Sequence, residues 1–156
     1  MRLENSNIEF APWTHSNRHD PKDPINLVFK KASLKEVIST IGWGRPLPGF
    51  KSTQYLHIAD EMKAQTDQRT RTFTWPFRRY RYHIRLWDLK ADGIVASAHR
   101  ETIPIHLPQS FEQAEKTIAF KFANDASWSV SYDILPVNNY ISHPPNNGHV
   151  TEVVKS

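Results

Sequence analysis

Residues 79–87 read RYRYHIRLW, and the chain must fold around the pattern of this stretch. The alternation has period two, which is the side-chain period of a β-strand. One face of the strand therefore carries Arg79, Arg81, His83, Arg85 and Trp87. The residues between them, two tyrosines, an isoleucine and a leucine, lie on the opposite face. That second face suits a buried core, and the first is a cationic ladder.

No acidic residue lies between Asp67 and Asp88, whereas the same interval holds six arginines. Crowded guanidinium groups repel one another, and their planar shape favours binding to carboxylate and phosphate. We expect the cationic face to be open and to accept an anionic small molecule or a phosphorylated group. The alternative without a ligand is a solvated sheet face that carries a cross-strand ion pair.

Residues 88–93 read DLKADG, a turn that joins this strand to an antiparallel partner at 94–103. One register matches polar with polar and apolar with apolar side chains through the middle of the hairpin. It sets His83 opposite His99, and it sets Arg81 opposite Glu101. The hairpin therefore predicts that His99 and Glu101 join the cationic face.

The other predicted elements follow from apolar period and turn residues: a strand at 25–29, a helix at 33–41, a loop at 43–54, a short helix at 55–64, a helix at 110–122 and a strand at 128–132. Ser33 and Glu36 have the spacing of a capping box at the start of the first helix. Gly42 follows the last apolar position of that helix and predicts its end.

The order strand, helix, strand, strand, helix, strand is typical of the split βαβ, or ferredoxin-like, pattern. We therefore predict an α+β fold with a four-stranded, mainly antiparallel sheet and its helices on one face. Residues 24–136 form the predicted single domain. Residues 1–23 and 137–156 are expected to be an N-terminal arm and a C-terminal tail, because they are polar, proline-containing and weakly periodic.

Composition narrows the class of protein. The 156 residues fit one domain, and a net charge of +4 favours anionic partners without requiring nucleic acid. The absence of cysteine excludes disulfides and thiolate chemistry. No apolar run reaches the roughly 20 residues that span a bilayer, and the N-terminus lacks the features of a secretory signal. We expect a soluble cytoplasmic protein, whose oligomeric state the sequence leaves open.

Eight histidines occur, but none has the His-Glu-x-x-His spacing of a metalloprotease site. His83, His99 and His106 could converge in space. A metal ion would also need counter-charge, and the neighbouring residues are mainly cationic. We therefore predict neither a metal site nor a cofactor.

Three segments resemble the LssY-like C-terminal domain family: DPINLVF at 23–29 followed by Gly42-Trp43, RYHIRLW at 81–87, and AHRE at 98–101 followed by His106 and a helix containing Glu112 and Glu115. The resemblance covers about residues 23–133. The middle segment, similar to the family's Arg-His-His-x-Arg-Leu-Trp stretch, is the most specific, although Tyr82 stands where the family tends to have histidine. The resemblance points to His83, Arg85, Trp87, His99 and Arg100, and it implies no established reaction.

The sequence thus predicts a binding module with six ligand-binding candidates: Arg81, His83, Arg85, Trp87, His99 and Arg100. The arginines at 81 and 85 would hold the anion, both histidines would donate hydrogen bonds, and Trp87 would wall the site. One alternative is a hydrolase in which His83 or His99 acts as general acid or base and Arg85 stabilises negative charge. Nucleic-acid binding through the arginines of 69–85 is less favoured, because the tyrosines face away from Arg81 and His83.

Overall fold

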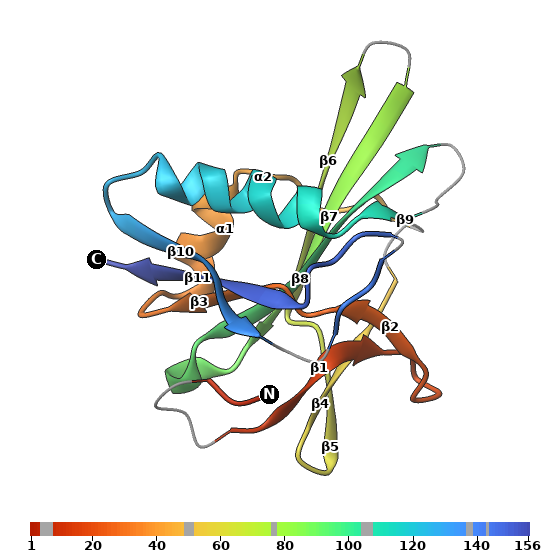
Figure 1. Ribbon diagram of the computed structural model, residues 1–156, viewed down its shortest axis with the longest axis vertical. Helices are drawn as coiled ribbons and strands as arrows, with labels where there is room; N and C mark the ends of the chain where they lie inside the picture. The colour runs from red at the N-terminus through yellow and green to blue at the C-terminus, as the bar shows by residue number, and fades with distance from the viewer. Residues whose placement is uncertain (4–7, 49–51, 76–77, 104–107, 137–138, 143) are drawn as a thin grey trace.

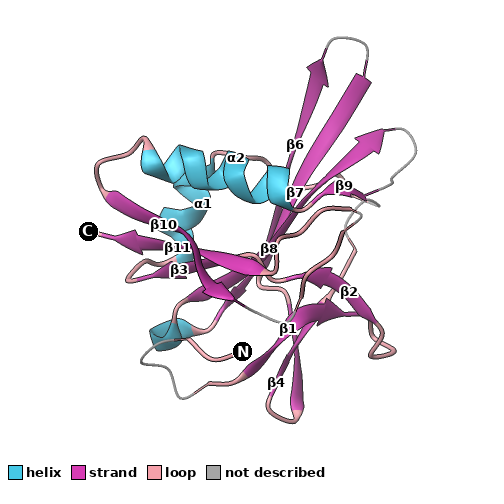
Figure 2. Cartoon of the chain, viewed as in Figure 1, coloured by secondary structure: helices cyan, strands magenta, loops and turns pink. Residues whose placement is uncertain are grey.

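The computed structural model describes residues 1–3, 8–48, 52–75, 78–103, 108–136, 139–142 and 144–156. These residues form two helices and two β-sheets (Figures 1 and 2). The elements are, in chain order, β1 (Phe10–His15), β2 (Pro21–Pro24), β3 (Leu27–Lys30), α1 (Leu34–Ile41), β4 (Tyr55–Ile58), β5 (Glu61–Ala64), β6 (Asp67–Trp75), β7 (Arg78–Asp88), a 3-10 turn (Lys90–Asp92), β8 (Ile94–Ile103), β9 (Pro108–Ser110), α2 (Glu112–Ala123), β10 (Trp128–Pro136) and β11 (His149–Lys155).

The larger sheet has the strand order β10-β11-β3-β8-β7-β6, with the short β9 paired to β8. Its strands are antiparallel to their neighbours except β11 and β3, which are parallel. The smaller sheet has the order β2-β1-β4-β5 and is antiparallel throughout. The predicted α+β class and the mainly antiparallel pairing are therefore confirmed.

The ferredoxin-like order is not confirmed. The strands at its predicted centre do lie side by side, as β3, β8 and β7. However, β11 lies between β3 and β10, where the predicted order would pair β3 with β10 directly, and β6 adds a further strand beside β7. The predicted four-stranded sheet is thus too small, and a second sheet was not foreseen.

Both helices pack on one face of the larger sheet, as predicted. Apolar side chains of α1 and α2, including Val37 and Ile118, share a buried cluster with Ile84 and Leu86 of β7. The Ser33–Glu36 capping box is confirmed at the start of α1. Gly42 ends that helix with a φ of 70°, a left-handed conformation that glycine adopts without steric cost.

The opposite face of the larger sheet is covered, so the prediction of an open face is wrong. Phe10 of β1 and Leu56 of β4 belong to a second buried cluster with Trp87 of β7 and Val95 of β8. This cluster joins the two sheets, which Figure 1 shows as separate layers. Trp87, the last residue of the cationic ladder, is apolar, and the smaller sheet packs against it.

The smaller sheet explains two further corrections. Residues 10–15 and 21–24, expected in an arm, form β1 and β2. Residues 55–64, expected to be helical, form the hairpin of β4 and β5, because Tyr55–Ile58 pairs with β1 along one edge. Tertiary pairing overrides the weak local preference of these short segments.

The predicted C-terminal tail is wrong for residues 149–155. They form β11, which pairs with β10 on one side and β3 on the other. Val150 and Val153 are fully buried, one in each apolar layer. A tail would leave both valines in water, so burial on the two faces explains the pairing.

Glu115 of α2 is buried, and burial raises the pKa of its carboxyl to about 8, although Thr151 donates a hydrogen bond to it over 2.7 Å. Folding therefore holds a proton on Glu115 between about pH 4.5 and pH 8, where the unfolded chain has lost it. This contribution to stability is complete below that window and is lost as the pH rises through it.

We expect Glu115→Gln to remove this pH dependence, because glutamine resembles the protonated acid. Relative to the variant, the wild type should lose on the order of 3 kcal/mol of unfolding free energy between pH 5 and pH 9. Urea unfolding at both pH values measures the difference. Glu61→Gln, at an exposed position, changes the charge equally and should show no such trend. Parallel pH profiles for wild type and Glu115→Gln would contradict a buried, protonated Glu115.

Candidate functional site

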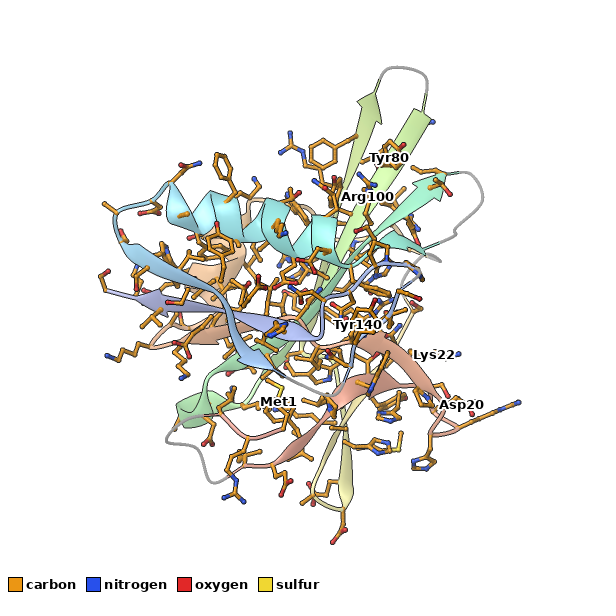
Figure 3. The ribbon with its side chains drawn as sticks, in the orientation of Figure 1. Met1, Asp20, Lys22, Tyr80, Arg100 and Tyr140 are labelled. Carbon is orange, nitrogen blue, oxygen red and sulfur yellow. The ribbon has the colours of Figure 1, made fainter. Side chains whose placement is uncertain are left out.

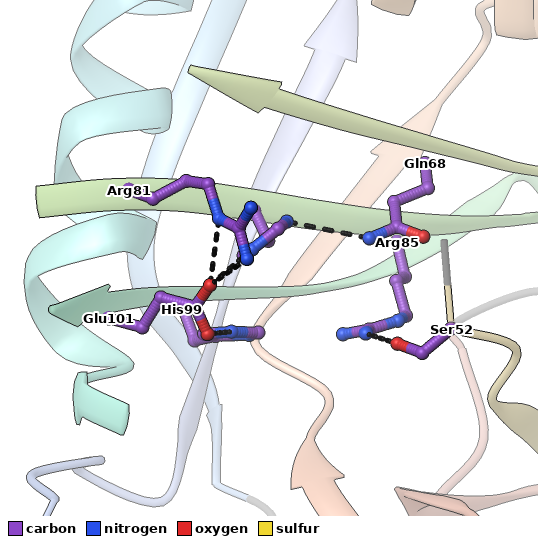
Figure 4. A pocket seen from close by; sticks show the side chains of 7 residues that line it. Ser52, Gln68, Arg81, Arg85, His99 and Glu101 are labelled. Carbon is purple, nitrogen blue, oxygen red and sulfur yellow. Dashed lines mark hydrogen bonds and ion pairs between the residues drawn. The ribbon is translucent and has the colours of Figure 1, made fainter. Parts of the chain in front are cut away.

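A pocket of about 230 Å³ lies on the covered face of the larger sheet (Figure 4). Its lining side chains come from three neighbouring strands and one loop: Ser52, Gln68, Arg81, His83, Arg85, His99 and Glu101. Four of the seven, Arg81, His83, Arg85 and His99, are predicted ligand-binding residues. All seven lining residues are polar or charged.

The predicted hairpin register places these residues together, and it is confirmed. His83 pairs with His99, Arg81 with Glu101, and Arg85 with Ser97. The two histidine rings lie with their centroids 5.0 Å apart. In an antiparallel pair, opposed residues share a face, so the odd-numbered positions of both strands form one continuous row.

Glu101 is at the centre of the polar contacts. Its Oε1 accepts hydrogen bonds from Arg81 Nε at 2.8 Å and from His83 Nε2 at 2.7 Å, and His99 Nε2 lies 3.4 Å from its Oε2. Burial by itself raises the pKa of this carboxyl, but these donors outweigh it and hold the pKa well below its ordinary range. Glu101 is therefore a buried carboxylate anion.

His83 is neutral. Burial lowers the pKa of its imidazole to about 4, although Glu101 opposes the shift. Because Nε2 donates to Glu101, the other ring nitrogen, Nδ1, is free to accept from the Gln68 side-chain amide 3.4 Å away. Both nitrogens of His83 are thus in contact with protein groups.

Arg85 is almost completely enclosed, with 4% of its surface exposed. Burial lowers the pKa of its guanidinium group, and the nearby Asp23 carboxylate opposes that shift. Nη2 donates to Ser52 Oγ at 2.6 Å, and Nη1 lies 3.3 Å from Asp23 Oδ2. Nε is buried and has no hydrogen-bond partner among the described residues.

Asp23 is a site residue that the sequence does not predict. It falls in the predicted N-terminal arm, yet its carboxylate lies beside Arg85 and 3.8 Å from His99 Nδ1. Gln54 donates to the same carboxylate oxygen over 2.9 Å. The resemblance segment at 23–29 begins at Asp23, which was the one available signal. Nothing in the sequence singled out Ser52 or Gln68.

Trp87 and Arg100 do not line the pocket. Trp87 is fully buried between the sheets and donates from Nε1 to the Lys63 carbonyl over 2.8 Å, so it belongs to the core. Arg100 follows His99 and therefore lies on the helix-bearing face, where its guanidinium covers the Tyr80 ring at 4.7 Å (Figure 3). His106 lies outside the described residues.

The arginine-rich stretch is divided between the two faces of the sheet, which reduces the crowding that the sequence suggested. Arg69 pairs with Asp67 at 2.9 Å, and Arg71 lies over the Phe73 ring. Tyr82 is buried against Phe73 and Trp43. This tyrosine is consequently not available for stacking on a nucleic-acid base.

Fold and pocket together define an α+β protein of two packed sheets with an open pocket lined by polar and charged side chains. Scans of protein-family models, curated proteins and solved structures each found no match to the chain. The resemblance to the LssY-like C-terminal domain family therefore stays a prediction. None of the described helices is long and apolar enough to cross a membrane.

Proposed function

We propose that the protein binds a small phosphate-bearing ligand in the pocket between Arg81, Arg85 and His99. The observation that carries the proposal is the enclosed guanidinium of Arg85, whose Nε is buried without a hydrogen-bond partner among the described residues. A buried donor without an acceptor costs about 1–3 kcal/mol, and a ligand oxygen would remove that cost. Arginine is suited to this role because its planar fork matches phosphate geometry.

The size of the pocket limits the ligand. A volume of about 230 Å³ is below the roughly 300–1,000 Å³ of pockets that hold drug-sized molecules. A phosphate group with a small substituent fits this space better than a nucleotide does. The Ser52 hydroxyl, already within 2.6 Å of Arg85, supplies a further group that can donate to the anion.

The two histidines have different roles in this proposal. His83 uses Nε2 to hold Glu101, so it supports the site and does not contact the anion. His99 has one ring nitrogen, Nδ1, without a hydrogen-bond partner among the described residues. The hydrolase alternative would therefore proceed through His99, because a general acid or base needs a ring nitrogen that is available to the substrate.

Inorganic phosphate, titrated calorimetrically, tests the proposal. We expect Arg85→Gln to weaken phosphate binding about tenfold or more, since a charge-assisted hydrogen bond contributes about 1.5–3 kcal/mol. Lys35→Gln is the matched control, because it removes the same charge from an exposed position on α1, in the helix layer. Its phosphate affinity should equal that of the wild type.

A second variant guards against misfolding, because Arg85→Gln leaves the Asp23 carboxylate with one partner fewer. Asp23→Asn combined with Arg85→Gln removes both charges and restores neutrality. Circular dichroism should show the wild-type fold for this double variant, while phosphate binding stays weak. Wild-type phosphate affinity in a folded Arg85 variant would contradict the proposal.

A further inference from the structure

The buried histidine pair and Glu101 form a group that the anion proposal does not fully use. One ligand atom from each of His83, His99 and Glu101 can be chosen so that all three lie within 4.8 Å of one another. Each side chain is more than nine-tenths buried, and each lines the same pocket. Two imidazoles with one carboxylate are a ligand set that holds Zn²⁺ in hydrolases and Fe²⁺ in oxygenases.

The distances between these atoms suit one shared ion. Zinc–nitrogen and zinc–oxygen bonds are about 2.0–2.2 Å long, so neighbouring ligand atoms around one ion lie about 3.0–3.5 Å apart. His99 Nε2 lies 3.4 Å from Glu101 Oε2, within that interval. His83 Nε2 lies 2.7 Å from Glu101 Oε1, and it must give up that hydrogen bond and its proton before its lone pair can face the ion.

Each candidate ligand also has an outer partner that would orient it. Behind His99, Asp23 Oδ2 lies 3.8 Å from Nδ1, in the place where metal-bound histidines have a carboxylate. Behind His83, the Gln68 side chain lies 3.4 Å from Nδ1. Arg81 holds Glu101 from the other side through Oε1. The unpartnered, buried Nδ1 of His99 is explained if this nitrogen carries the proton that faces Asp23.

Charge no longer argues against an ion. The prediction of no metal rests in part on the mainly cationic neighbouring residues. The structure adds Asp23, so two carboxylates lie beside the arginines at 81 and 85. A divalent ion would leave the pocket with an excess positive charge, which a phosphate dianion neutralises. Three protein ligands in a pocket leave the open position that is typical of zinc sites that bind a substrate or water.

We propose that His83, His99 and Glu101 bind one divalent transition-metal ion, with Zn²⁺ as the test ion. The inference goes beyond anion binding, and it does not require it. In the metal-bound state, Nε2 of each histidine and Oε2 of Glu101 face the ion, and Arg81 stays on Oε1. The Gln68 amide then rotates to accept from Nδ1–H of His83.

Calorimetric titration with ZnCl₂ tests this site, and a second histidine group must be removed first. His15, His19 and His57 lie together at the smaller sheet and could take up zinc adventitiously: the His15 ring stacks on His57 with centroids 3.9 Å apart, and ring nitrogens of His19 and His57 lie 3.3 Å apart. In a background with all three histidines replaced by alanine we expect one zinc equivalent to bind. Asp23→Asn in that background should weaken binding about tenfold through the orientation of His99.

His99→Leu is the decisive variant, because in the described part of the chain the His99 side chain makes one long hydrogen bond, at 3.4 Å, and leucine keeps apolar packing against its neighbours, so the fold should stay intact. Removal of a ligand is expected to weaken zinc binding by about 100-fold or more, and Glu101→Gln should do the same. Zinc should also raise the melting temperature of the background protein but not of His99→Leu. Undiminished zinc affinity in His99→Leu, or loss of all binding in the background, would overturn the inference.

Zinc and phosphate titrations are separate measurements, so their outcomes can be told apart. A protein that binds zinc at His99 but no phosphate supports the metal site and contradicts the proposed function. A protein that binds phosphate through Arg85 but no zinc after chelator treatment contradicts the metal site and leaves the proposed function intact.

Discussion

Removal of residues 149–156 is expected to leave a chain that does not fold. These residues contain β11, which separates β10 from β3 and provides the larger sheet's one parallel pairing in the described chain. Without it, β10 has no partner strand and the backbone groups of β3 on that side are unpaired. Buried backbone donors and acceptors without partners are costly, so the loss of one inner strand affects the whole sheet.

Circular dichroism and hydrogen exchange would measure this effect. The truncated chain should lack cooperative thermal unfolding, whereas the full chain should show it. Val153→Ala tests the same strand without truncation, and its partner control is Val154→Ala on the half-exposed opposite face. The first should cost about 1–3 kcal/mol more than the second. A truncated chain with the wild-type unfolding transition would show that β11 is dispensable.

Trp87→Ala should lower the free energy of unfolding by about 3–5 kcal/mol, the range for large core aromatics. The indole is fully buried between the two sheets, and its N–H is bonded to the Lys63 carbonyl of β5. Trp87→Phe keeps part of the ring packing and loses that hydrogen bond, so its cost should be smaller. Urea unfolding measures both variants.

Tyr140→Ala is the control for Trp87, because Tyr140 is an exposed aromatic residue and its removal should change stability by less than about 0.5 kcal/mol. The comparison also separates two roles for Trp87. A wall of the binding site would lose phosphate affinity with little loss of stability, and a core residue would lose stability first. Trp87→Ala with wild-type stability would contradict its place in the core.

The centre of the fold could be predicted because one pattern runs through the middle of the hairpin. Five consecutive pairs of β7 and β8, from His83–His99 to Trp87–Val95, match polar with polar or apolar with apolar side chains, so a slip by one residue would bury charge and expose leucine. The capping box of α1 is similarly local, since Ser33 and Glu36 are three residues apart.

The rest of the fold depends on pairing between distant segments. β11 pairs with β3 across more than a hundred residues, and β1 pairs with β4 across about forty. Short strands of four to seven residues carry little periodic signal, so composition suggested an arm and a tail. The valines of β11 are the apolar residues that a buried strand needs, but they indicate a strand only once β3 is known to lie beside them.

The candidate site likewise combines residues that the hairpin pattern predicts with residues that long-range pairing places. Arg81, His83, Arg85, His99 and Glu101 come from the one hairpin whose register was readable, and they converge as expected. Ser52 lines the pocket and Asp23 lies beside Arg85 and His99, and both come from segments whose positions depend on the smaller sheet. Because the predicted site lacks Asp23, it is more cationic than the observed site, and it lacks the carboxylate that lies behind His99.

Two-dimensional ¹H–¹⁵N NMR of the chain titrated with inorganic phosphate tests the central claim most directly. The predicted result is a set of saturable shifts confined to the pocket, at the backbone amides of Ser52, Arg85 and His99, and abolished in the Asp23→Asn, Arg85→Gln variant. The amide of Lys35, in the helix layer, should not move. Shifts confined to exposed lysines and arginines, with none at Arg85 or His99, would contradict a phosphate site in the pocket.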